Sequence, residues 1–396
     1  MRGPTISQYT ESVTHPEGKF RRVVGVVCET DAYGKPVFTS GGSGVVFKVR
    51  IAGRTAALKC FSGFGRSNVK ELYTSISAET TPLLYRCEWL PQELYVFDEC
   101  GRGGWHDILI SEWAEGSTLE YEIRKALHYR DGARLLDLAE AFEEMALQLL
   151  GMPWSHGDLK PSNIMVEKHT GLMRLLDYES MVVPGLANDA ATISSYGCPK
   201  MDLHRDGLYA DEYPIAMIMC TLRSLARDPA LYAKYGTSDY FLFSPEELFS
   251  GSVCKAWEEA KTAAAREGDA RVYTLLEMLA KPSAHLENLK EIILFLPGGS
   301  DTGDPAPEPF VKGGKWGYRS GGKMLIPAIY DNALEFREGF GVVETGVFRH
   351  YINNKGEVVI NGSEYETLKS FYDGHGEVRK SGVWYRIDRN GVLEKK

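Results

Sequence analysis

The sequence lacks the features that mark a membrane or secreted protein. It has no run of 18 or more apolar residues, so it predicts no membrane-spanning helix. Residues 1–10 lack the basic-then-apolar pattern of a secretory signal, which leads us to expect a cytoplasmic protein. The seven cysteines include no Cys-x-x-Cys pair, which argues against a zinc site or a disulfide framework. With a net charge of −9, we expect neither a nucleic-acid nor a membrane partner.

The clearest interruption in the chain is the segment 297–309, which contains four prolines and three glycines. Such a composition holds neither a helix nor a strand, so we interpret it as a linker. It separates residues 1–296 from a tail, 310–396. Within the first part, residues 20–113 predict strands and residues 114–296 predict mostly helices. This order predicts two lobes with a site between them.

The predicted strands are rich in β-branched or aromatic residues and end at glycine or charged turns. They cover 20–29, 45–51, 55–61, 93–98 and 107–113. A helix is predicted over 67–84, and the most regular helical pattern covers 133–150, where apolar residues recur every three or four positions.

The strongest chemical motif runs from His156 to Ile164. In it, Asp158 is followed by Lys160 and Asn163, a spacing that serves phosphoryl transfer. The carboxylate can orient a hydroxyl and accept its proton, the ammonium can face a transferring phosphate, and the amide oxygen can bind Mg²⁺. Asp177 follows a short apolar run 14 residues later and offers a second oxygen ligand.

Two upstream features complete this set. The glycine-rich turn at 39–46 lies between predicted strands, where backbone N–H groups can approach phosphates closely. Lys59 lies in the following strand and needs a carboxylate partner to hold it. We predict that this partner is Glu79, with Glu71 as the alternative.

Together these motifs resemble eukaryotic-type protein kinases over about residues 20–296. The resemblance implies an α+β, two-lobed protein-kinase-like fold with ATP and Mg²⁺ as cofactors. Its implied catalytic residues are Asp158, Lys160, Lys59 and Glu79. Its implied cofactor-binding residues are Gly41, Gly42, Ser43, Gly44, Val46, Ala57, Lys59, Glu112, Ala114, Asn163 and Asp177.

Within this resemblance each motif has a role. Asp158 is the catalytic base, Lys59 and Glu79 form an ion pair, and Asn163 and Asp177 are the metal ligands. Ser111 is the gatekeeper and 112–114 is the adenine-binding hinge. Asp211 starts a helix over 211–226 that buttresses the catalytic loop.

The tail resembles bacterial WG-repeat segments. Its first unit carries the sequence Lys315-Trp316-Gly317-Tyr318, and weaker units follow at Phe348 and Trp384, spaced by 32 and 36 residues. The resemblance and the spacing predict a small all-β domain over 310–396. We expect this domain to recruit a substrate or a protein partner.

Four features depart from the kinase pattern. Thr39 replaces the first glycine of the loop, Gly157 replaces the usual Arg before Asp158, the metal motif is Asp-Tyr-Glu at 177–179, and no Ala-Pro-Glu motif is present. Without the Arg, we expect no phosphorylation switch in the activation segment.

These observations predict an ATP-dependent serine/threonine protein kinase that acts on a protein hydroxyl. Three alternatives remain open. The His-Gly-Asp triplet is also typical of small-molecule phosphotransferases of the aminoglycoside and choline type, although Lys160 favours the protein-kinase side. The departures at Thr39 and 177–179 also allow a pseudokinase scaffold, and the tail could make the protein mainly an interaction module.

Overall fold

The computed structural model contains helix and strand in equal shares, which confirms a mixed α and β protein. It describes residues 3–62, 66–98, 100–188, 194–249, 254–281, 283, 285–296, 298, 307–320, 323–337, 339–353, 356–372, 375–388 and 391–395. The predicted linker 297–309 lies mostly outside the described residues. Among the described helices, none combines the length and apolar character needed to cross a membrane.

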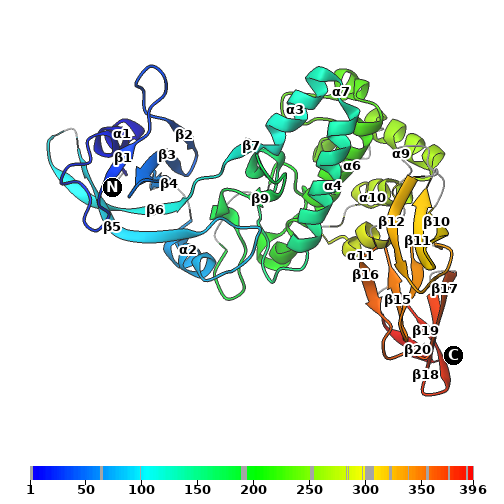
Figure 1. Cartoon of the computed structure of the whole chain (residues 1–396). Helices are drawn as coiled ribbons and strands as arrows, with labels where there is room; N and C mark the ends of the chain where they lie inside the picture. Colours follow the sequence, from blue (N-terminus) through cyan, green and yellow to red (C-terminus); the bar gives the residue numbers. More distant parts are fainter. Residues whose placement is uncertain are drawn as a thin grey trace. The chain divides into compact units, whose positions relative to one another are not determined.

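The chain divides into two compact units, and Figure 1 labels their helices and strands. The first unit contains residues 1–218 and 282–285, and the second contains 219–281 and 286–396. The division falls within one helix, α6 (Glu212–Arg227). The tail therefore belongs to the same unit as the helices that precede it.

The first unit opens with an antiparallel sheet in the order β1-β3-β4-β6-β5, with β2 paired to β3. The strands are β1 (Val26–Cys28), β2 (Phe38–Gly41), β3 (Gly44–Ile51), β4 (Arg54–Phe61), β5 (Cys87–Phe97) and β6 (Gly103–Glu112). Compared with the predicted strands, β1 is shorter than 20–29, β5 and β6 are longer than 93–98 and 107–113, and β2 is additional. The helix predicted over 67–84 is only α2 (Val69–Ser77).

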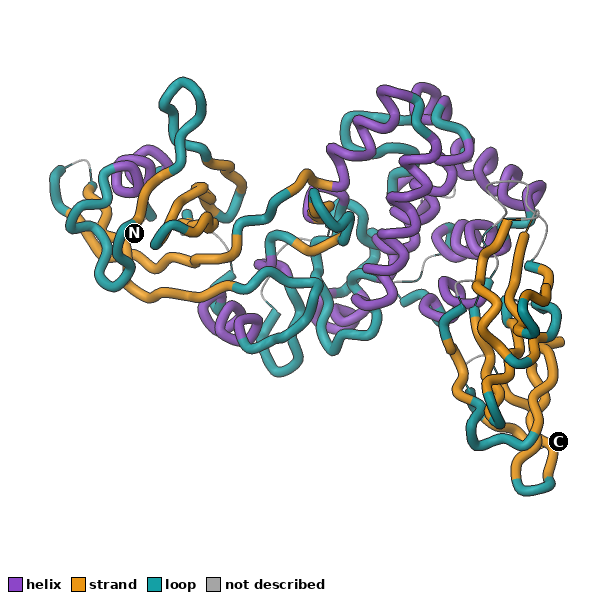
Figure 2. The backbone as a smooth tube through the Cα atoms, in the orientation of Figure 1, coloured by secondary structure: helices purple, strands orange, loops and turns teal. Residues whose placement is uncertain are grey.

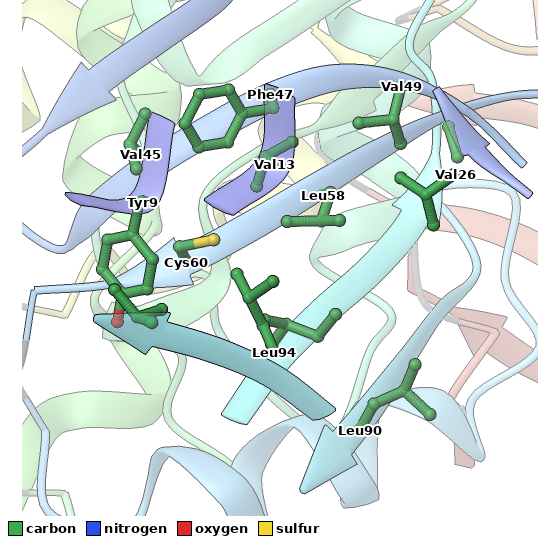
Figure 3. Close-up of a cluster of buried hydrophobic side chains, with 13 residues drawn as sticks. Tyr9, Val13, Val26, Val45, Phe47, Val49, Leu58, Cys60, Leu90 and Leu94 are labelled. Carbon is green, nitrogen blue, oxygen red and sulfur yellow. The ribbon is translucent and has the colours of Figure 1, made fainter. Parts of the chain in front are cut away.

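One face of this sheet is the core of the unit's N-terminal part (Figure 3). Alternate residues of β3 and β4 point into it, because successive side chains of a strand lie on opposite faces. Helix α1 (Ile6–Thr14), which the sequence analysis did not predict, covers this face with Tyr9 and Val13. Its first turn is closed by a capping box between Thr5 and Gln8.

The rest of the first unit is mostly helical. The predicted helix over 133–150 is confirmed by α4 (Gly132–Leu149), whose first turn is capped by the Asp131 side chain. The other elements are β7 (Gly116–Thr118), α3 (Leu119–Tyr129), η1 (Pro161–Asn163), β8 (Ile164–Glu167), β9 (Met173–Leu175), η2 (Tyr178–Ser180), α5 (Leu203–Asp206), η3 (Gly207–Tyr209) and the start of α6.

In the described residues, the second unit combines the end of α6 and further helices with the strands of the tail (Figure 2). The further helices are α7 (Ala230–Tyr235), α8 (Pro245–Phe249), α9 (Lys255–Glu267), α10 (Ala270–Leu279) and α11 (Leu289–Phe295). The described part of the tail forms three antiparallel sheets, which confirms its all-β character.

The first sheet contains β10 (Glu308–Lys312), β11 (Lys315–Ser320) and β12 (Lys323–Tyr330). The second contains β13 (Asn332–Ala333), β14 (Gly341–Thr345), β15 (Phe348–Ile352) and β16 (Val358–Asn361). The third contains β17 (Thr367–Tyr372), β18 (His375–Lys380), β19 (Val383–Ile387) and β20 (Leu393–Lys395).

Each tail sheet contains a hairpin with a two-residue turn. Gly313 and Gly314 form the first turn, Gly346 starts the second and Gly382 ends the third, all with φ between 61° and 79°. Such positive φ values suit glycine and match the twist of paired strands. The turns align Trp316 and Trp384 as the second residue of their strands, whereas Phe348 is the first and lies 49% exposed.

The tail core includes a residue that precedes the predicted linker. Phe295 of α11 stacks on Phe340 with ring centroids 4.7 Å apart, and Phe340 stacks in turn on Phe371 at 4.1 Å. A Cβ at Gly339 would lie 2.3 Å from the Phe295 carbonyl oxygen, so the backbones approach closely there. Helix α11 and the tail therefore share one apolar core.

Candidate functional site

The site begins on the face of the first sheet that lies opposite the apolar core. In the strand register Val46 pairs with Lys59, and Ala57 pairs with Ser111. Because directly paired residues and those two apart share a face, these four side chains lie on one side of the sheet. Three of them, Val46, Ala57 and Lys59, belong to the predicted nucleotide-binding set.

The predicted phosphate loop is the hairpin between β2 and β3. Gly41 pairs with Gly44, and Gly42 and Ser43 form the turn between them. Gly44 is required by packing, because a Cβ there would lie 2.0 Å from the Cys60 carbonyl oxygen. Gly41 and Gly42 are exposed with open space around them, so their backbone is accessible to a ligand.

Lys59 has two carboxylate partners in the described structure, and both come from the segment after β9. Its Nζ lies 2.9 Å from Asp177 Oδ1 and 2.5 Å from Glu179 Oε1. The predicted pairing with Glu79 is therefore corrected: Glu79 lies just after α2 with an exposed side chain. The physical reason is that α2 ends at Ser77, two residues before the acid. The alternative Glu71 is exposed as well.

The backbone at 177–179 directs both carboxylates toward Lys59. Asp177 adopts a left-handed conformation with φ 62°, and the single turn η2 follows it. Tyr178 anchors this turn, because its hydroxyl donates to the Leu175 carbonyl at 3.0 Å and accepts from the Tyr85 N–H at 2.9 Å. The tyrosine of the Asp-Tyr-Glu motif thus makes two buried hydrogen bonds through its hydroxyl, which a phenylalanine at this position could not make.

The charges at Lys59 perturb one another. Burial alone would lower the pKa of the Lys59 amine, but the carboxylates of Glu179 and Asp177 outweigh this and raise it. Burial raises the pKa of Glu179 to about 7, against the opposing effect of Lys59. For Asp177, burial is outweighed by the hydrogen bond with Glu179 and the charge of Lys59, so its pKa is lowered. The pKa values of the two acids are therefore shifted in opposite directions.

A second group of side chains lies in the loop 156–163. Lys160 Nζ is 2.7 Å from Asp158 Oδ2, and Asn163 Nδ2 donates to the same oxygen at 2.9 Å. Asn163 Nδ2 also donates to the Asp158 main-chain carbonyl at 2.9 Å. These bonds orient the Asp158 carboxylate. Because the Asn163 nitrogen faces Asp158, the amide oxygen of Asn163 points away from it.

Strand pairing places the two predicted metal ligands at one end of a ladder. Asn163 precedes β8 and Asp177 follows β9, and these strands pair with Ile164 opposite Leu175. The Leu176 N–H also donates to the Asn163 carbonyl at 2.8 Å. One carboxylate and one amide oxygen suit Mg²⁺, which keeps water and binds nucleotide phosphates through its other positions. Within the described part of the chain, no cluster of three or more His, Cys, Asp or Glu side chains could hold a metal by itself.

Gly157 lies at a position that has no room for a side chain. Its φ is 78°, and a Cβ there would lie 2.1 Å from the Ser180 carbonyl oxygen. The loop at 156–158 and the segment after Asp177 therefore pass too closely for any residue other than glycine. Asp211, just before α6, accepts from the N–H groups of His156 at 2.5 Å and Gly157 at 3.0 Å, so it buttresses this loop as predicted.

The predicted hinge follows β6. Glu112 ends the strand, and its N–H donates to the Arg86 carbonyl at 3.0 Å. Ala114 lies half-buried between β6 and β7. The hinge segment thus continues directly from the strand that pairs with the Lys59 strand.

Sequence reasoning missed three residues that build the site. Glu179 and Tyr73 form a hydrogen bond of 2.6 Å beside Lys59. Arg66, 7% exposed, donates to the carbonyls of Met181 at 2.5 Å and Ala187 at 2.7 Å. A signal for Glu179 existed in its spacing of two from Asp177, but neither Tyr73 nor Arg66 belongs to a recognisable motif.

A cavity in another part of the described structure lies away from these residues. It has a volume of about 610 Å³ and lies in the second unit, where Arg227, Lys255 and Arg266 alternate with Asp228 and acidic residues of α9. Basic and acidic side chains are mixed along the wall of this cavity, so the cavity does not favour ligands of one charge. It contains none of the predicted site residues.

Comparison with known families bears on the tail. The family model described as "WG containing repeat" matches residues 320–346 and 351–384. Over these residues the tail is similar to WG repeats. The first match contains β12, β13 and β14, and the second contains β16, β17 and β18, while Trp316 lies just before the first match. No kinase-domain family model matches the chain, and no curated protein matches it.

Proposed function

We propose that the first unit is an ATP-dependent serine/threonine protein kinase, with a two-lobed protein-kinase-like fold, that transfers the γ-phosphate of Mg-ATP to a protein hydroxyl. One observation carries the proposal. Lys59, Asp158 with Lys160 and Asn163, and Asp177 come from three separate segments and form two adjoining clusters of the charge types that phosphoryl transfer uses.

Each residue has a part that its surroundings support. Lys59 and Lys160 would offset negative charge on the phosphates. Asn163 and Asp177 would hold Mg²⁺, which supplies charge neutralisation at the phosphate oxygens. Asp158, oriented by Lys160 and Asn163, would accept the proton of the acceptor hydroxyl. Gly41 and Gly42 would let the turn cover the phosphates.

The acceptor separates this proposal from its nearest alternative. Lys160 beside Asp158 supports a protein hydroxyl, following the kinase resemblance. A small-molecule acceptor is the second candidate, and the observation that favours it is the close packing of Gly157 on Ser180, which leaves no room for the Arg that protein kinases use there. A nucleotide-binding scaffold without turnover is the third.

The WG repeats would recruit the protein substrate or a partner and so raise its effective concentration. Several apolar side chains of the tail are exposed and could form such a surface, namely Val311, Met324, Leu325, Ile329, Leu334, Val347, Phe348, Val358, Val383 and Val392. Replacing each by Glu in the full chain should raise KM for the native protein acceptor at one or more positions, while a short peptide acceptor keeps its KM. An unchanged KM at all ten positions would contradict recruitment by this surface.

Transfer of label from γ-labelled ATP with Mg²⁺ tests the proposal. The wild-type chain is compared with Asp158→Ala against a protein mixture and a panel of hydroxylated metabolites. Label on protein that is lost in the variant supports a protein kinase, and label on a metabolite supports the second candidate. Nucleotide binding without any transfer supports the scaffold, and no binding overturns the proposal.

A further inference from the structure

The carboxylate that pairs with Lys59 lies in a different segment of the chain from the predicted partner. A carboxylate on α2 would tie this helix directly to the lysine, but the buried partner is Glu179, in the turn after Asp177. We propose that Glu179, held by Tyr73 of α2, is the positioning residue that keeps Lys59 aimed at the nucleotide. This inference rests on the proposed function and names a control element of the same site.

Burial distinguishes the two acids that share the lysine. The Asp177 side chain is 47% exposed, whereas Glu179 is 15% and Lys59 is 11% exposed. Asp177 is therefore accessible to a bound metal, which would draw its carboxylate away from the ammonium. Glu179 faces the interior, so it remains beside Lys59 when Asp177 turns to another ligand. A buried lysine needs such a permanent partner, because an unpaired internal charge is costly.

Tyr73 connects this pair to α2. Its hydroxyl lies 2.6 Å from Glu179 Oε1, the same oxygen that Lys59 Nζ approaches to 2.5 Å. The ring is 1% exposed and packs against Trp89 at 6.0 Å and Tyr178 at 6.3 Å between centroids. One carboxylate oxygen thus receives two donors from fixed side chains, so a movement of α2 would be transmitted to Lys59 through Glu179.

The lead-in to α2 makes a second connection to the same segment. Arg66, three residues before the helix, donates to the Met181 carbonyl, two residues beyond Glu179. It also donates to Ala187, whose carbonyl accepts from Asn68 Nδ2 at 2.8 Å as well. Both ends of the Glu179 turn therefore contact α2 or its lead-in, by neutral or permanently charged groups that require no phosphorylation.

The test compares four variants in the full chain, Glu179→Gln, Glu179→Asp, Tyr73→Phe and Glu79→Gln. Glu179→Gln keeps the shape and the hydrogen bond but removes the charge, and we expect kcat to fall roughly 10- to 100-fold. Tyr73→Phe should lower kcat by about fivefold, and Glu179→Asp should recover part of the activity of the Gln variant. Glu79→Gln is the matched control and should leave kcat and KM for ATP unchanged.

A merely structural role is separated by combining Glu179→Gln with Lys59→Ala. If Glu179 acts through Lys59, it has no further effect on kcat once the lysine is absent. Additive losses, or wild-type kcat in Glu179→Gln, would overturn the inference while the proposed function stands. A kcat loss in Glu79→Gln instead would restore the acid beside α2 as the partner. A wild-type chain with neither transfer nor nucleotide binding would overturn the proposed function and this inference with it.

Discussion

The candidate site and the WG tail are built by contacts of different sequence range. At the site, Lys59 meets Asp177 over a separation of 118 residues, and Tyr73 meets Glu179 over 106. In the tail, the Tyr318 hydroxyl donates to the Leu334 carbonyl 16 residues away, and the Tyr351 hydroxyl to the Lys369 carbonyl 18 residues away. The comparison teaches that the contacts of a repeat join residues that are near in sequence. The partner of a charged site residue, in contrast, depends on how distant segments fold together.

The tail repeats this local pattern in its turns. Asp331 accepts from the Gly346 N–H at 2.7 Å, and Glu366 accepts from the Gly382 N–H at 2.9 Å. Each acid therefore caps the hairpin turn of the following unit, 15 or 16 residues later. Short-range ties of this kind recur along a sequence, which makes them recognisable to a family model. The site has no comparable recurrence.

The largest expected effect is on chemistry at the long-range site. Replacing Asp177 or Lys59 by Ala should lower phosphoryl transfer about a thousandfold, because each removes a charge that faces the phosphates or the metal. The folds of both units should persist, which circular dichroism and denaturant unfolding would check. Turnover close to wild type in either variant would contradict the role proposed for the replaced residue.

The second effect is on the stability of the tail core. Phe340 is fully buried among Phe295, Tyr351 and Phe371, so Phe340→Ala should cost about 3–5 kcal/mol in the unfolding free energy. The matched control is Phe348→Ala, which removes a half-exposed ring from a hairpin and should cost much less. Equal losses would show that the aromatic core does not dominate the tail.

The third effect tests the close approach of the backbones at Gly157 and Ser180. Gly157 and Gly171 have similar positive φ values, 78° and 72°, but only Gly157 would place a Cβ against another backbone. Gly157→Ala should cost about 3 kcal/mol, from strain and overpacking together, and should reduce transfer as well. Gly171→Ala should cost only about 1 kcal/mol, from backbone strain alone. If urea unfolding gives equal losses of unfolding free energy for the two variants, the close contact of Gly157 with Ser180 does not contribute to stability.

The smallest effect probes the local ties of the tail. Tyr318→Phe and Tyr351→Phe each remove a hydroxyl that donates from a buried ring to main-chain carbonyls, so each should cost about 1 kcal/mol of unfolding free energy. Tyr129, which is 71% exposed, provides the control and should tolerate Phe without measurable loss. A tail that unfolds identically in all three variants would contradict the role given to the tyrosines.

Much of the architecture could be predicted from local sequence. The helix over 133–150 has a regular apolar period and a capping Asp131, and the tail turns carry glycine where φ is positive. Helix α1 was missed because its pattern is short. The helix over 67–84 was predicted too long, because its apolar residues continue into a segment that packs without helical structure.

The site was predictable in its motifs but not in its pairing. Asp158, Lys160 and Asn163 lie within six residues and have few ways to be arranged, and the structure brings them together. The partner of Lys59 depends on where α2 ends and how the backbone turns at Asp177, neither of which a motif specifies. In the sequence, Gly157 is only a departure from a pattern. The structure gives a physical reason for glycine, because a Cβ there would lie 2.1 Å from the Ser180 carbonyl oxygen.

Binding of ATP in the presence and absence of Mg²⁺ tests the central claim most directly. Titration calorimetry on the full chain, with Lys59→Ala beside it, measures the affinity without requiring turnover or a known acceptor. The account predicts Mg²⁺-dependent binding that weakens at least about tenfold in the variant, as loss of one charge-assisted contact implies. Absence of ATP binding by the wild-type chain, or equal binding by both proteins, would contradict it.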